Sequence, residues 1–396
     1  RQTRRGLGIK ACTITNCKIR KEMHFDRKNY FYPDNPKNYQ ITQNETPIGY
    51  DGYVEIEDNG VKKKIYIEEM HIEEDTCKST HRNDSTLLDF NRAGVPLIEI
   101  VTKPCISTPE EAKLYLEKLR ELLFYADISD CKMEEGSMRA DANISIRLKG
   151  AKEFGTRAEI KNVNSFRALV RALEYEFERQ AEILEEGGSV VQETRLWDDN
   201  SGTTSSMRGK EDAHDYRYFP EPDLMPLEVS QEWVDKIARE MPELPAQKLE
   251  RYQSIGLSEY DASVLVNQID MALYFDKLIE QKADPKTASN FLMGEVAAYL
   301  KEEKINIENS KLSVENFVKL LDLLKKGIIS NNIAKGLIID ILKTGEDAAV
   351  LVEKKGLSVI SDESSILPIV QKIVASNPEQ VAAYKGGRDK LFGFFV

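Results

Sequence analysis

Hydrophobic and polar residues alternate without a break along residues 138–147, MRADANISIR. This period of two predicts a strand with one buried face, because successive side chains of a strand point to opposite sides of the sheet. Asp, Asn and Ser are poor strand formers, so their presence on the other face is unusual. We therefore expect that face to do more than contact solvent. It would carry Arg139, Asp141, Asn143, Ser145 and Arg147.

The same kind of pattern predicts further strands, and the first two-fifths of the chain is expected to consist mainly of strands and turns. Residues 50–74 form two alternating runs on either side of Asp58-Asn59-Gly60, and Asn-Gly between two strands indicates a hairpin. Residues 94–104, GVPLIEIVTKP, predict a short apolar strand, and residues 154–166 predict another.

Two helices are predicted among these strands. Residues 108–126 begin with a threonine cap, a proline in the first turn and two glutamates near the positive end of the helix dipole. Residues 165–186 end at a Gly-Gly pair, which is typical of a helix C-terminus. Strands and helices do not alternate regularly, as they would in a parallel sheet. The pattern predicts an α+β domain with a mainly antiparallel sheet.

From Gln231 onwards, apolar residues recur at the 3.6-residue period of helices. This change follows a proline-rich segment, YFPEPDLMPL at residues 218–227, and a second break lies near residues 285–310. We predict three domains: an α+β domain over residues 1–228, an all-α domain over residues 229–292 and an all-α tail over residues 293–396.

The composition narrows the possible classes of protein. An apolar fraction of 41% and a charged fraction of 31% are typical of a globular protein, and no apolar run approaches the roughly 18 residues of a membrane span. The net charge of -12 argues against indiscriminate nucleic-acid binding, but it allows a local basic patch. The five cysteines are odd in number and form no C-x-x-C motif. They argue against a disulfide framework or a zinc knuckle and favour a reducing compartment.

Two carboxylates are candidate metal-binding residues. Glu99 lies inside the apolar run VPLIEIV, where a buried carboxylate would need a cation, a metal or a proton. Glu74 shares a side of its strand with Met70 and Ile72, so we expect it to point inward. Two inward carboxylates from separate strands suit a hard divalent ion such as Mg²⁺. The ordinary alternatives are, for Glu99, a glutamate at a strand edge or one paired with arginine and, for Glu74, a solvated acidic run.

The remaining candidates are cationic or mixed. Lys28 in FDRKNYFYPD lies beside aromatic residues, where it could meet a phosphate or a carboxylate or simply lie at the surface. Glu159 and Lys161 share one face of a predicted strand, as partners of the polar face of residues 138–147 or as simple sheet pairs. The chain has no P-loop, dinucleotide-binding or kinase motif, and its four histidines give little support to a histidine-based triad. Any nucleotide would therefore be bound by an antiparallel sheet, carboxylates and a metal.

Five long motifs resemble the GatB family, the B subunits of aspartyl/glutamyl-tRNA amidotransferases. In chain order they are FDRKNYFYPDNPKNYQIT, LLDFNRAGVPLIEIVTKP, KMEEGSMRADANISIR, AEIKNVNSFRAL and DYRYFPEPDLMPL. The similarity runs from about residue 17 to the end of the chain, and motifs of this length and order are highly specific.

The resemblance implies a fold and a reaction. The expected fold is a cradle domain like that of glutamine synthetase, then a helical domain and a YqeY-like helical tail that hold the tRNA. Family members act with GatA, an amidase that releases ammonia from glutamine, and with GatC. With ATP and Mg²⁺ they phosphorylate the side chain of Glu on tRNA(Gln), or of Asp on tRNA(Asn), and ammonia then displaces the phosphate. A cytoplasmic location of bacterial type is implied, with an organelle as the alternative.

Roles are carried over motif by motif. Glu74 and Glu99 fall where the family has acidic metal ligands, and Lys28 falls in a segment lining the ammonia route. We assign Lys28, Arg139 and Asp141 to catalysis. Phosphoryl transfer needs such groups because metal ions and cations stabilise its spread negative charge. The binding of ATP or substrate is assigned to Asn143, Ser145, Arg147, Glu159 and Lys161.

The chain departs from the family pattern at its ends. The family opens with a strand, GLEVHVQL, whose Glu and His complete the metal site, and it has a C-terminal extension. This sequence begins after the first and ends before the second. We therefore expect the 396-residue chain by itself to be inactive and poorly folded. A non-catalytic tRNA-binding or assembly subunit is the alternative function, and a free-standing carboxylate–amine ligase is disfavoured by the helical C-terminal third.

The predicted tail is rich in basic residues. Most charged runs are solvated helix faces, but some of these residues should meet phosphates if the tail holds tRNA, and that binding would weaken steeply with salt. The residues are Lys325, Lys326, Lys335, Lys343, Lys354, Lys355, Lys385, Arg388 and Lys390.

Overall fold

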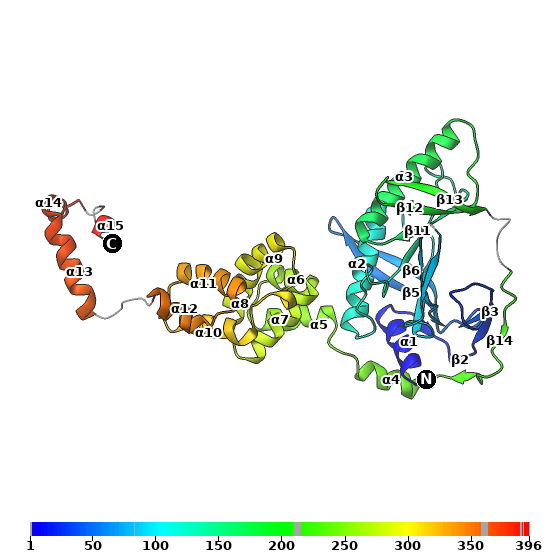
Figure 1. Cartoon of the computed structure of the whole chain (residues 1–396), viewed down its shortest axis with the longest axis horizontal. Coiled ribbons are helices and arrows are strands. Elements are labelled where there is room, and N and C mark those ends of the chain that lie inside the picture. Colours follow the sequence, from blue (N-terminus) through cyan, green and yellow to red (C-terminus); the bar gives the residue numbers. More distant parts are fainter. Residues whose placement is uncertain are drawn as a thin grey trace. The chain divides into compact units, whose positions relative to one another are not determined.

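The computed structural model describes residues 2–82, 84–209, 215–357, 363–388, 390 and 392–395. The chain forms two compact units, residues 1–247 and residues 248–396. The first contains the sheets and the second is helical (Figure 1). The structure is thus mixed, with antiparallel sheets and many helices, as predicted. The boundaries predicted at residues 228 and 292 stay predictions.

The first sheet of unit one is antiparallel and has the strand order β1-β5-β6-β9. Its strands are β1 (Lys18–Ile19), β5 (Gly49–Asp58), β6 (Val61–Glu74) and β9 (Pro96–Thr102). Strands β5 and β6 form the predicted hairpin, in which Asn59 has a φ of 49° and Gly60 a φ of 79°. Both residue types tolerate this left-handed backbone, so the turn prediction is confirmed.

The second sheet has the order β10-β11-β12-β13. Its strands are β10 (Ala140–Ile144), β11 (Ala158–Val163), β12 (Glu193–Asp198) and β13 (Thr203–Gly209). Helix α3 (Phe166–Glu185) connects β11 to β12 and provides the crossover that a parallel pair needs. The other pairs of this sheet are antiparallel. Strand β10 is shorter than the predicted strand over residues 138–147, and its pairing with β11 is irregular between Ala140 and Ala142.

Three smaller sheets lie in the same unit. Strand β3 (Asp26–Asn29) lies between β14 (Phe219–Pro220) and β4 (Tyr39–Thr42), so the proline-rich segment returns to the start of the unit. Strand β15 (Leu227–Glu228) pairs with β2 (Glu22–Met23). Strands β7 (Lys78–His81) and β8 (Thr86–Asp89) form a hairpin.

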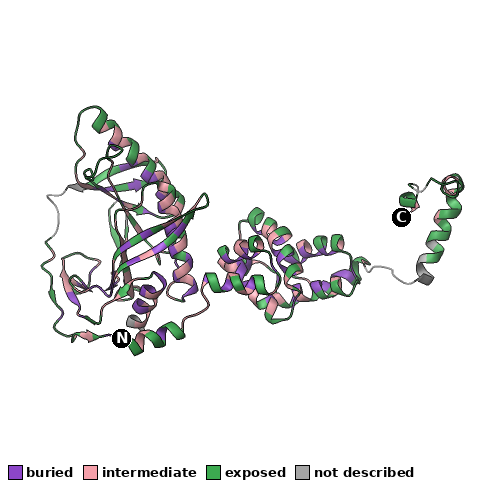
Figure 2. Cartoon of the chain, turned by 180° about the vertical axis from the view of Figure 1, so that it is seen from behind, coloured by how far each residue is buried: buried purple, intermediate pink, exposed green. Residues whose placement is uncertain are grey.

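Helices cover the two large sheets. The predicted helices are confirmed as α2 (Pro109–Tyr125), capped by the Thr108 hydroxyl, and α3, capped by the Ser165 hydroxyl. Helix α2 packs against β5 and α3, while α3 packs against β10, β11 and β13. Buried residues concentrate along the strands and the inward sides of these helices (Figure 2).

The first residues of the chain form a helix, α1 (Gln2–Ile14), where we predicted strands and turns. Its sequence has two glycines and no side-chain cap or apolar stripe that would predict a helix. Tertiary packing decides instead, because α1 packs against β5, β6 and α4 (Gln231–Arg239). A Cβ at Gly8 would lie 2.9 Å from side-chain carbons of both Ile48 and Ile72. Glycine therefore permits the close approach of α1 to the sheet.

Unit two is built from helices. They are α5 (Pro245–Ser254), which begins just before the unit, α6 (Glu259–Asn267), α7 (Ile269–Glu280), α8 (Pro285–Phe291), the π-helical turn Leu292–Val296, α9 (Ala297–Glu303), the 3-10 turn Ile307–Asn309, α10 (Val314–Lys325), α11 (Asn331–Thr344), α12 (Ala348–Lys355), α13 (Glu363–Ser376), α14 (Pro378–Lys385) and α15 (Phe392–Phe395).

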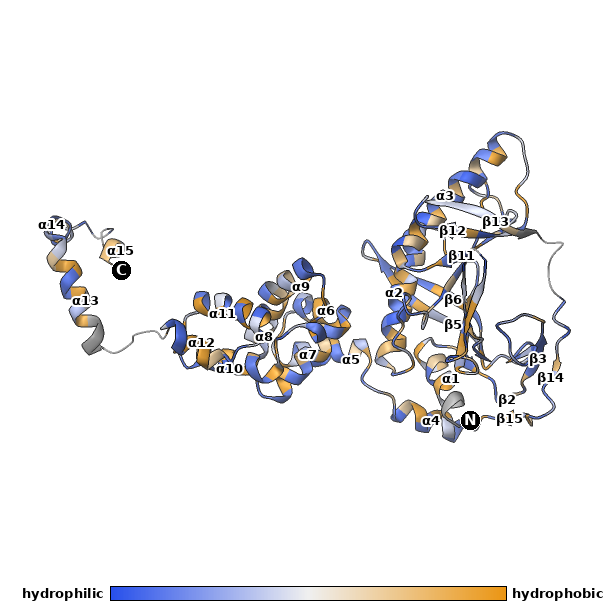
Figure 3. Cartoon of the chain, viewed as in Figure 1, coloured by the Kyte–Doolittle hydropathy of each residue, from blue (hydrophilic) through white to orange (hydrophobic). Residues whose placement is uncertain are grey.

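An aromatic core joins several of these helices. The rings of Tyr252 on α5 and Phe275 on α7 are 4.9 Å apart, and those of Phe291 on α8 and Phe317 on α10 are 6.4 Å apart. Hydrophobic residues alternate with hydrophilic ones around each helix (Figure 3), as the 3.6-residue period predicts. Among the described residues, no helix combines the length and apolarity needed to cross a membrane.

Candidate functional site

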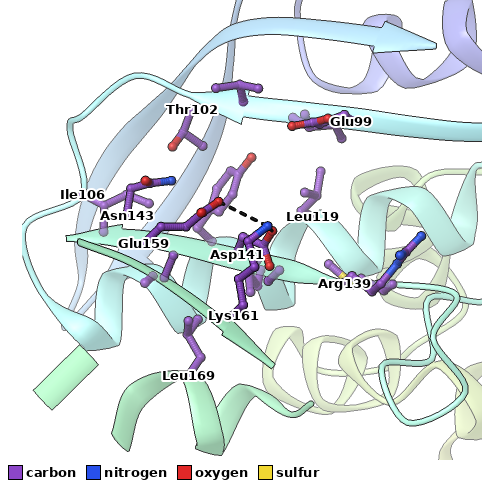
Figure 4. Close-up of a pocket in the computed structure, with 18 of the residues that line it drawn as sticks. Glu99, Thr102, Ile106, Leu119, Arg139, Asp141, Asn143, Glu159, Lys161 and Leu169 are labelled. Carbon is purple, nitrogen blue, oxygen red and sulfur yellow. Dashed lines mark hydrogen bonds and ion pairs between the residues drawn. The ribbon is translucent and has the colours of Figure 1, made fainter. Parts of the chain in front are cut away.

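A cleft of about 2530 Å³ lies in unit one and is bordered by strands of both large sheets. Glu99 and Thr102 on β9 lie on one side, and Asp141, Asn143, Glu159 and Lys161 on β10 and β11 lie on the other (Figure 4). Leu119 on α2 and Leu169 on α3 add an apolar wall. Typical pockets for single small ligands measure roughly 300–1,000 Å³. The cleft therefore has room for more than one reactant.

His71 lies between two carboxylates at the β6–β9 side of the cleft. Its Nε2 atom is 3.2 Å from Oε2 of Glu99 and 3.4 Å from Oε1 of Glu73. His71 and Glu99 are directly paired across β6 and β9, so their side chains leave the same face of the sheet. One ligand atom from each of the three residues lies within 4.8 Å of the others. Of the described residues, these three form the only cluster with the spacing of a metal site.

Neighbouring side chains hold Glu73 in place, and the charged groups of the cluster shift one another's pKa values. The Thr42 hydroxyl donates to Glu73 at 2.7 Å, and the Gln40 amide donates to it at 3.3 Å. Burial opposes the protonated form of His71, but the carboxylates of Glu73 and Glu99 outweigh it and raise the pKa of His71 to about 9. The hydrogen bond from His71, with help from Lys28 and Lys161, lowers the pKa of Glu99 against the effect of burial.

This cluster can hold a divalent ion. It offers one imidazole nitrogen and two carboxylates, which are common ligands of divalent metals. The buried Nδ1 atom of His71 has no hydrogen-bond partner among the described residues, and its nearest charged contact is Glu69 at 3.8 Å. Without a metal, the raised pKa of His71 favours a protonated imidazole, whose single positive charge offsets one of the two neighbouring carboxylate charges.

The structure does not bring the predicted metal pair together. Glu74 pairs with Pro96 in the register, three residues beyond His71, and so lies on the opposite face of the sheet from Glu99. Its carboxylate contacts Lys37 and accepts from the Ile41 amide at 3.1 Å. The expectation of a buried Glu99 was also wrong: its side chain is 52% exposed, because β9 is an edge strand that borders the cleft.

The opposite wall of the cleft carries a lysine between two carboxylates. Nζ of Lys161 donates to Asp141 at 3.1 Å and lies 3.4 Å from Glu159. Burial opposes the charge on Lys161, but Asp141 and Glu159 outweigh burial and raise its pKa. Lys161 also acts on Glu99 across the cleft. Three predicted residues of the polar face and its partner strand are therefore gathered at one place.

Arg139 lies at the other end of β10, beside Arg92. Nη2 of Arg139 donates to Asp75 at 2.8 Å, and Nε of Arg92 lies 3.5 Å from the same carboxylate. The side chain of Asp75 is mostly buried, while that of Arg139 is about half exposed to the cleft. One acid thus holds two guanidinium groups, leaving donors free to meet an anion.

Lys28 lies on β3 and borders the cleft. Its Nζ atom is 4.9 Å from the centre of the Tyr216 ring, a cation–π distance. Its charge helps to lower the pKa of Glu99. Lys28 is therefore close enough to the candidate metal cluster for its positive charge to act on Glu99.

The last residues of the predicted polar face differ in whether they lie on β10. Asn143 pairs with Glu159 across β10 and β11 and borders the cleft. Ser145 and Arg147 follow the end of β10. Arg147 donates to the Lys152 carbonyl at 2.8 Å and lies 4.5 Å from the centre of the Phe154 ring. Arg147 thus contacts the β10–β11 loop. The single polar row predicted over residues 139–147 therefore ends with β10, before Ser145 and Arg147.

Sequence reasoning missed four residues of the site: His71, Glu73, Asp75 and Arg92. The first three belong to the acidic run EEMHIEED, in which we chose Glu74 by its shared side with Met70 and Ile72. The same alternation places His71 and Glu73 together on the other side, which was the available signal. Arg92 lies in a turn, where no periodicity applies.

Comparisons with known proteins support one family. The model of the GatB/GatE catalytic domain matches residues 3–235, and the model described as the GatB domain matches residues 273–396. The first match alone covers more than half of the chain. It includes every residue of the cleft described above.

Curated relatives match almost the whole chain. The B subunit of an aspartyl/glutamyl-tRNA(Asn/Gln) amidotransferase of Clostridium botulinum, strain Loch Maree, is 50% identical over 391 residues, covering 98% of this chain and 82% of the relative. The protein of the same name from Caldicellulosiruptor bescii is 51% identical over 394 residues, with the same coverage. That of Caldicellulosiruptor saccharolyticus is also 51% identical over 394 residues.

Proposed function

Because the chain belongs to the GatB/GatE family, we propose that it is the B subunit of an amidotransferase acting on tRNA charged with Glu or Asp. The enzyme converts Glu-tRNA(Gln) to Gln-tRNA(Gln), Asp-tRNA(Asn) to Asn-tRNA(Asn), or both. It is a ligase of protein biosynthesis that forms a carbon–nitrogen bond with glutamine as the nitrogen donor. The observation that carries this proposal is 50% identity to a B subunit of this enzyme over 98% of the chain.

The reaction requires that a poor electrophile be activated. A carboxylate resists attack by ammonia until one of its oxygens becomes part of a leaving group, and transfer of the γ-phosphoryl group of ATP provides one. The transition state spreads negative charge over the phosphoryl oxygens, so it is stabilised by metal ions and cations. The cleft offers both kinds of group on facing walls.

We assign ATP and Mg²⁺ to this cleft. His71, Glu73 and Glu99 would hold the ion, which when bound would neutralise phosphate charge. The assignment of Glu74 as a ligand is harder to support, since its carboxylate contacts Lys37 on the other face of the sheet. Arg139 and Arg92, oriented by Asp75, would bind phosphate oxygens through guanidinium donors.

The remaining residues would position the aminoacyl group. Lys161 is held in its protonated form by Asp141 and Glu159, so it can pair with the substrate carboxylate or with phosphate. Asp141 and Asn143 offer acceptors to the substrate amine or to ribose. Lys28 would lie where ammonia arrives. Ser145 and Arg147 are farther along the chain from β10 and would contact the outer part of the ligand.

Partners and domains follow from the same proposal. GatA would supply ammonia from glutamine through a channel, and GatC would complete the complex. The first unit would be the cradle resembling glutamine synthetase. The helical region, proposed as domains over residues 229–292 and 293–396 with a YqeY-like tail, would hold the tRNA.

The test is amide formation by the assembled three-subunit enzyme with Glu-tRNA(Gln), glutamine and ATP. Glu99→Gln should abolish the ATP-dependent formation of Gln-tRNA(Gln) while the complex still assembles. Glu57→Gln is the matched control, because Glu57 is an exposed glutamate on β5 outside the cleft. Amide formation by the Glu99→Gln enzyme at the rate of the control would contradict the assignment of the cleft. A wild-type complex that assembles but makes no amide would instead support the assembly-subunit alternative.

A further inference from the structure

Two cysteines lie side by side where α1 meets the first sheet, and neither is among the residues assigned to amide formation. Cys12 is in the last turns of α1, and Cys17 immediately precedes β1. The Cys17 amide donates to the Cys12 carbonyl at 2.9 Å. From standard bond lengths, the two Cα atoms are then no more than about 7 Å apart. Disulfides span about 4.4–6.8 Å between Cα atoms, so this backbone contact suits one.

Both thiols occupy space that two glycines of β5 leave open. A Cβ at Gly49 would lie 2.5 Å from Sγ of Cys12 and 3.2 Å from Cβ of Cys17. A Cβ at Gly52 would lie 2.3 Å from Sγ of Cys17. Asp51 lies between them with a φ of 49°, and the β5–β6 pairing skips this residue, which places both glycines toward the thiols. Any larger residue at either glycine would displace a thiol.

The two thiols differ in their surroundings. Cys12 is fully buried, and its sulfur lies 3.7 Å from Sδ of Met70. Cys17 is only partly buried, and its sulfur is 3.3 Å from the Thr15 hydroxyl. The neighbouring Cys12 thiol lowers the pKa of Cys17 to about 7; burial opposes this effect and Thr15 adds to it. The lowered pKa favours the thiolate of Cys17, which is the nucleophilic form.

We propose that Cys12 and Cys17 form an oxidation site for peroxides, with Cys17 as the thiol attacked first and Cys12 as its resolving partner. The Cys17 thiolate attacks one peroxide oxygen, the O–O bond breaks, and Cys17 becomes a sulfenic acid. With hydrogen peroxide, the other oxygen takes up a proton and leaves as water. The Cys12 sulfur then displaces hydroxide from the sulfenic acid, which forms the S–S bond and releases a second water. Two thiols are oxidised and one peroxide is reduced.

This inference goes beyond amide synthesis and does not depend on it. Disulfides in reducing compartments are usually transient and redox-sensing rather than structural. A solvent-accessible, low-pKa thiol next to a resolving cysteine is typical of such sensors, and Cys17 is the more accessible of the two thiols. All five cysteines are free in the structure, which therefore represents the reduced form.

The experiment exploits the positions of Lys10 and Lys18. Trypsin releases residues 11–18, ACTITNCK, as one peptide holding both cysteines, whereas Cys77, Cys105 and Cys131 fall in separate peptides. The assembled complex is treated with limiting hydrogen peroxide, unfolded in denaturant so that buried free thiols become accessible, alkylated, digested and analysed by mass spectrometry. We expect this peptide to lose two hydrogens and to escape alkylation, while the other three cysteines stay alkylated. Full alkylation of Cys12 and Cys17 at peroxide levels that oxidise Cys105 would overturn the proposal.

Two variants separate the roles of the thiols. Cys12→Ser should stop the reaction at the Cys17 sulfenic acid, which dimedone traps. Cys17→Ser should leave Cys12 alkylatable only after unfolding. Cys131→Ser, which removes a buried thiol elsewhere, is the control and should not change the 11–18 peptide. Alkylation of Cys17 in the wild type should rise with pH with a midpoint near its pKa of about 7. A midpoint at the value of an ordinary thiol, about 8.5, would contradict the proposed activation.

Discussion

The Nε2 atom of His71 on β6 lies 3.2 Å from the carboxylate of Glu99 on β9, and the two residues face each other directly across the antiparallel pair. This contact brings an imidazole and a strand-edge carboxylate to the rim of a large cleft. It is the geometric basis for assigning a divalent ion to the β6–β9 side.

Replacing His71 by alanine should weaken the binding of Mn²⁺ to the assembled complex by at least tenfold. The substitution removes one of the three proposed ligands, and it is the only nitrogen ligand of the cluster. Calorimetric titration with Mn²⁺ would measure the affinity without any need for activity. His24→Ala is the control, because His24 is not part of the cluster of His71, Glu73 and Glu99. Equal Mn²⁺ affinity of the two variants would exclude His71 as a ligand.

Arg139→Ala should lower the rate of ATP-dependent amide formation by about 10²–10³, a usual cost for losing one charged donor to a transition state. Arg139→Lys should recover only part of the rate, since lysine cannot present the planar pair of donors. Steady-state kinetics with varied ATP would separate binding from catalysis. Arg167→Ala, an exposed arginine on α3 outside the cleft, serves as the control. A normal rate for Arg139→Ala would remove Arg139 from the proposed mechanism.

Glu221→Gln should make unit one less stable at neutral pH and less sensitive to acid. Glu221 is buried and receives 2.7 and 2.9 Å hydrogen bonds from Arg27, which lower its pKa against burial. A depressed folded-state pKa contributes stability above the usual carboxyl pKa of about 4.3, and that stability is lost as pH falls through the lower folded value. We expect a loss of about 1–3 kcal/mol at pH 7. Chemical denaturation at pH 7 and below pH 4 would measure it, and an undiminished acid dependence would contradict the prediction.

Lys325 and Lys326 should contribute to tRNA binding. Both are exposed at the end of α10, and within the described residues the electrostatic effect of Lys325 is a through-space one on Asp284. In contrast, Lys335, Lys354 and Lys355 lie 2.6–3.0 Å from Glu295, Glu346 and Asp340. Replacing Lys325 and Lys326 by alanine should reduce the slope of log affinity against log salt by about one per lost phosphate contact. Lys354→Ala is the control, and equal salt slopes would place the tRNA elsewhere.

Local sequence signals were sufficient where one element decides its own structure. Asn59-Gly60 specified the hairpin turn, the cap at Thr108 specified where α2 begins, and the Gly187-Gly188 pair specified where α3 ends. The alternation of MRADANISIR placed Asp141 and Asn143 on the polar side of a strand, and both border the cleft. The resemblance to the GatB family, carried by five motifs, is confirmed by the family comparisons.

Only the tertiary structure decided which residues meet. Alternation along β6 gave two faces, but the choice between Glu74 and the pair His71 and Glu73 depends on the register with β9, which lies some thirty residues away. Helix α1 forms because a sheet is available for Gly8 to approach, not because of its own propensity. Arg92 and Arg139 come together because both contact Asp75. Periodicity describes one element at a time, whereas a site is made by the register and packing between elements.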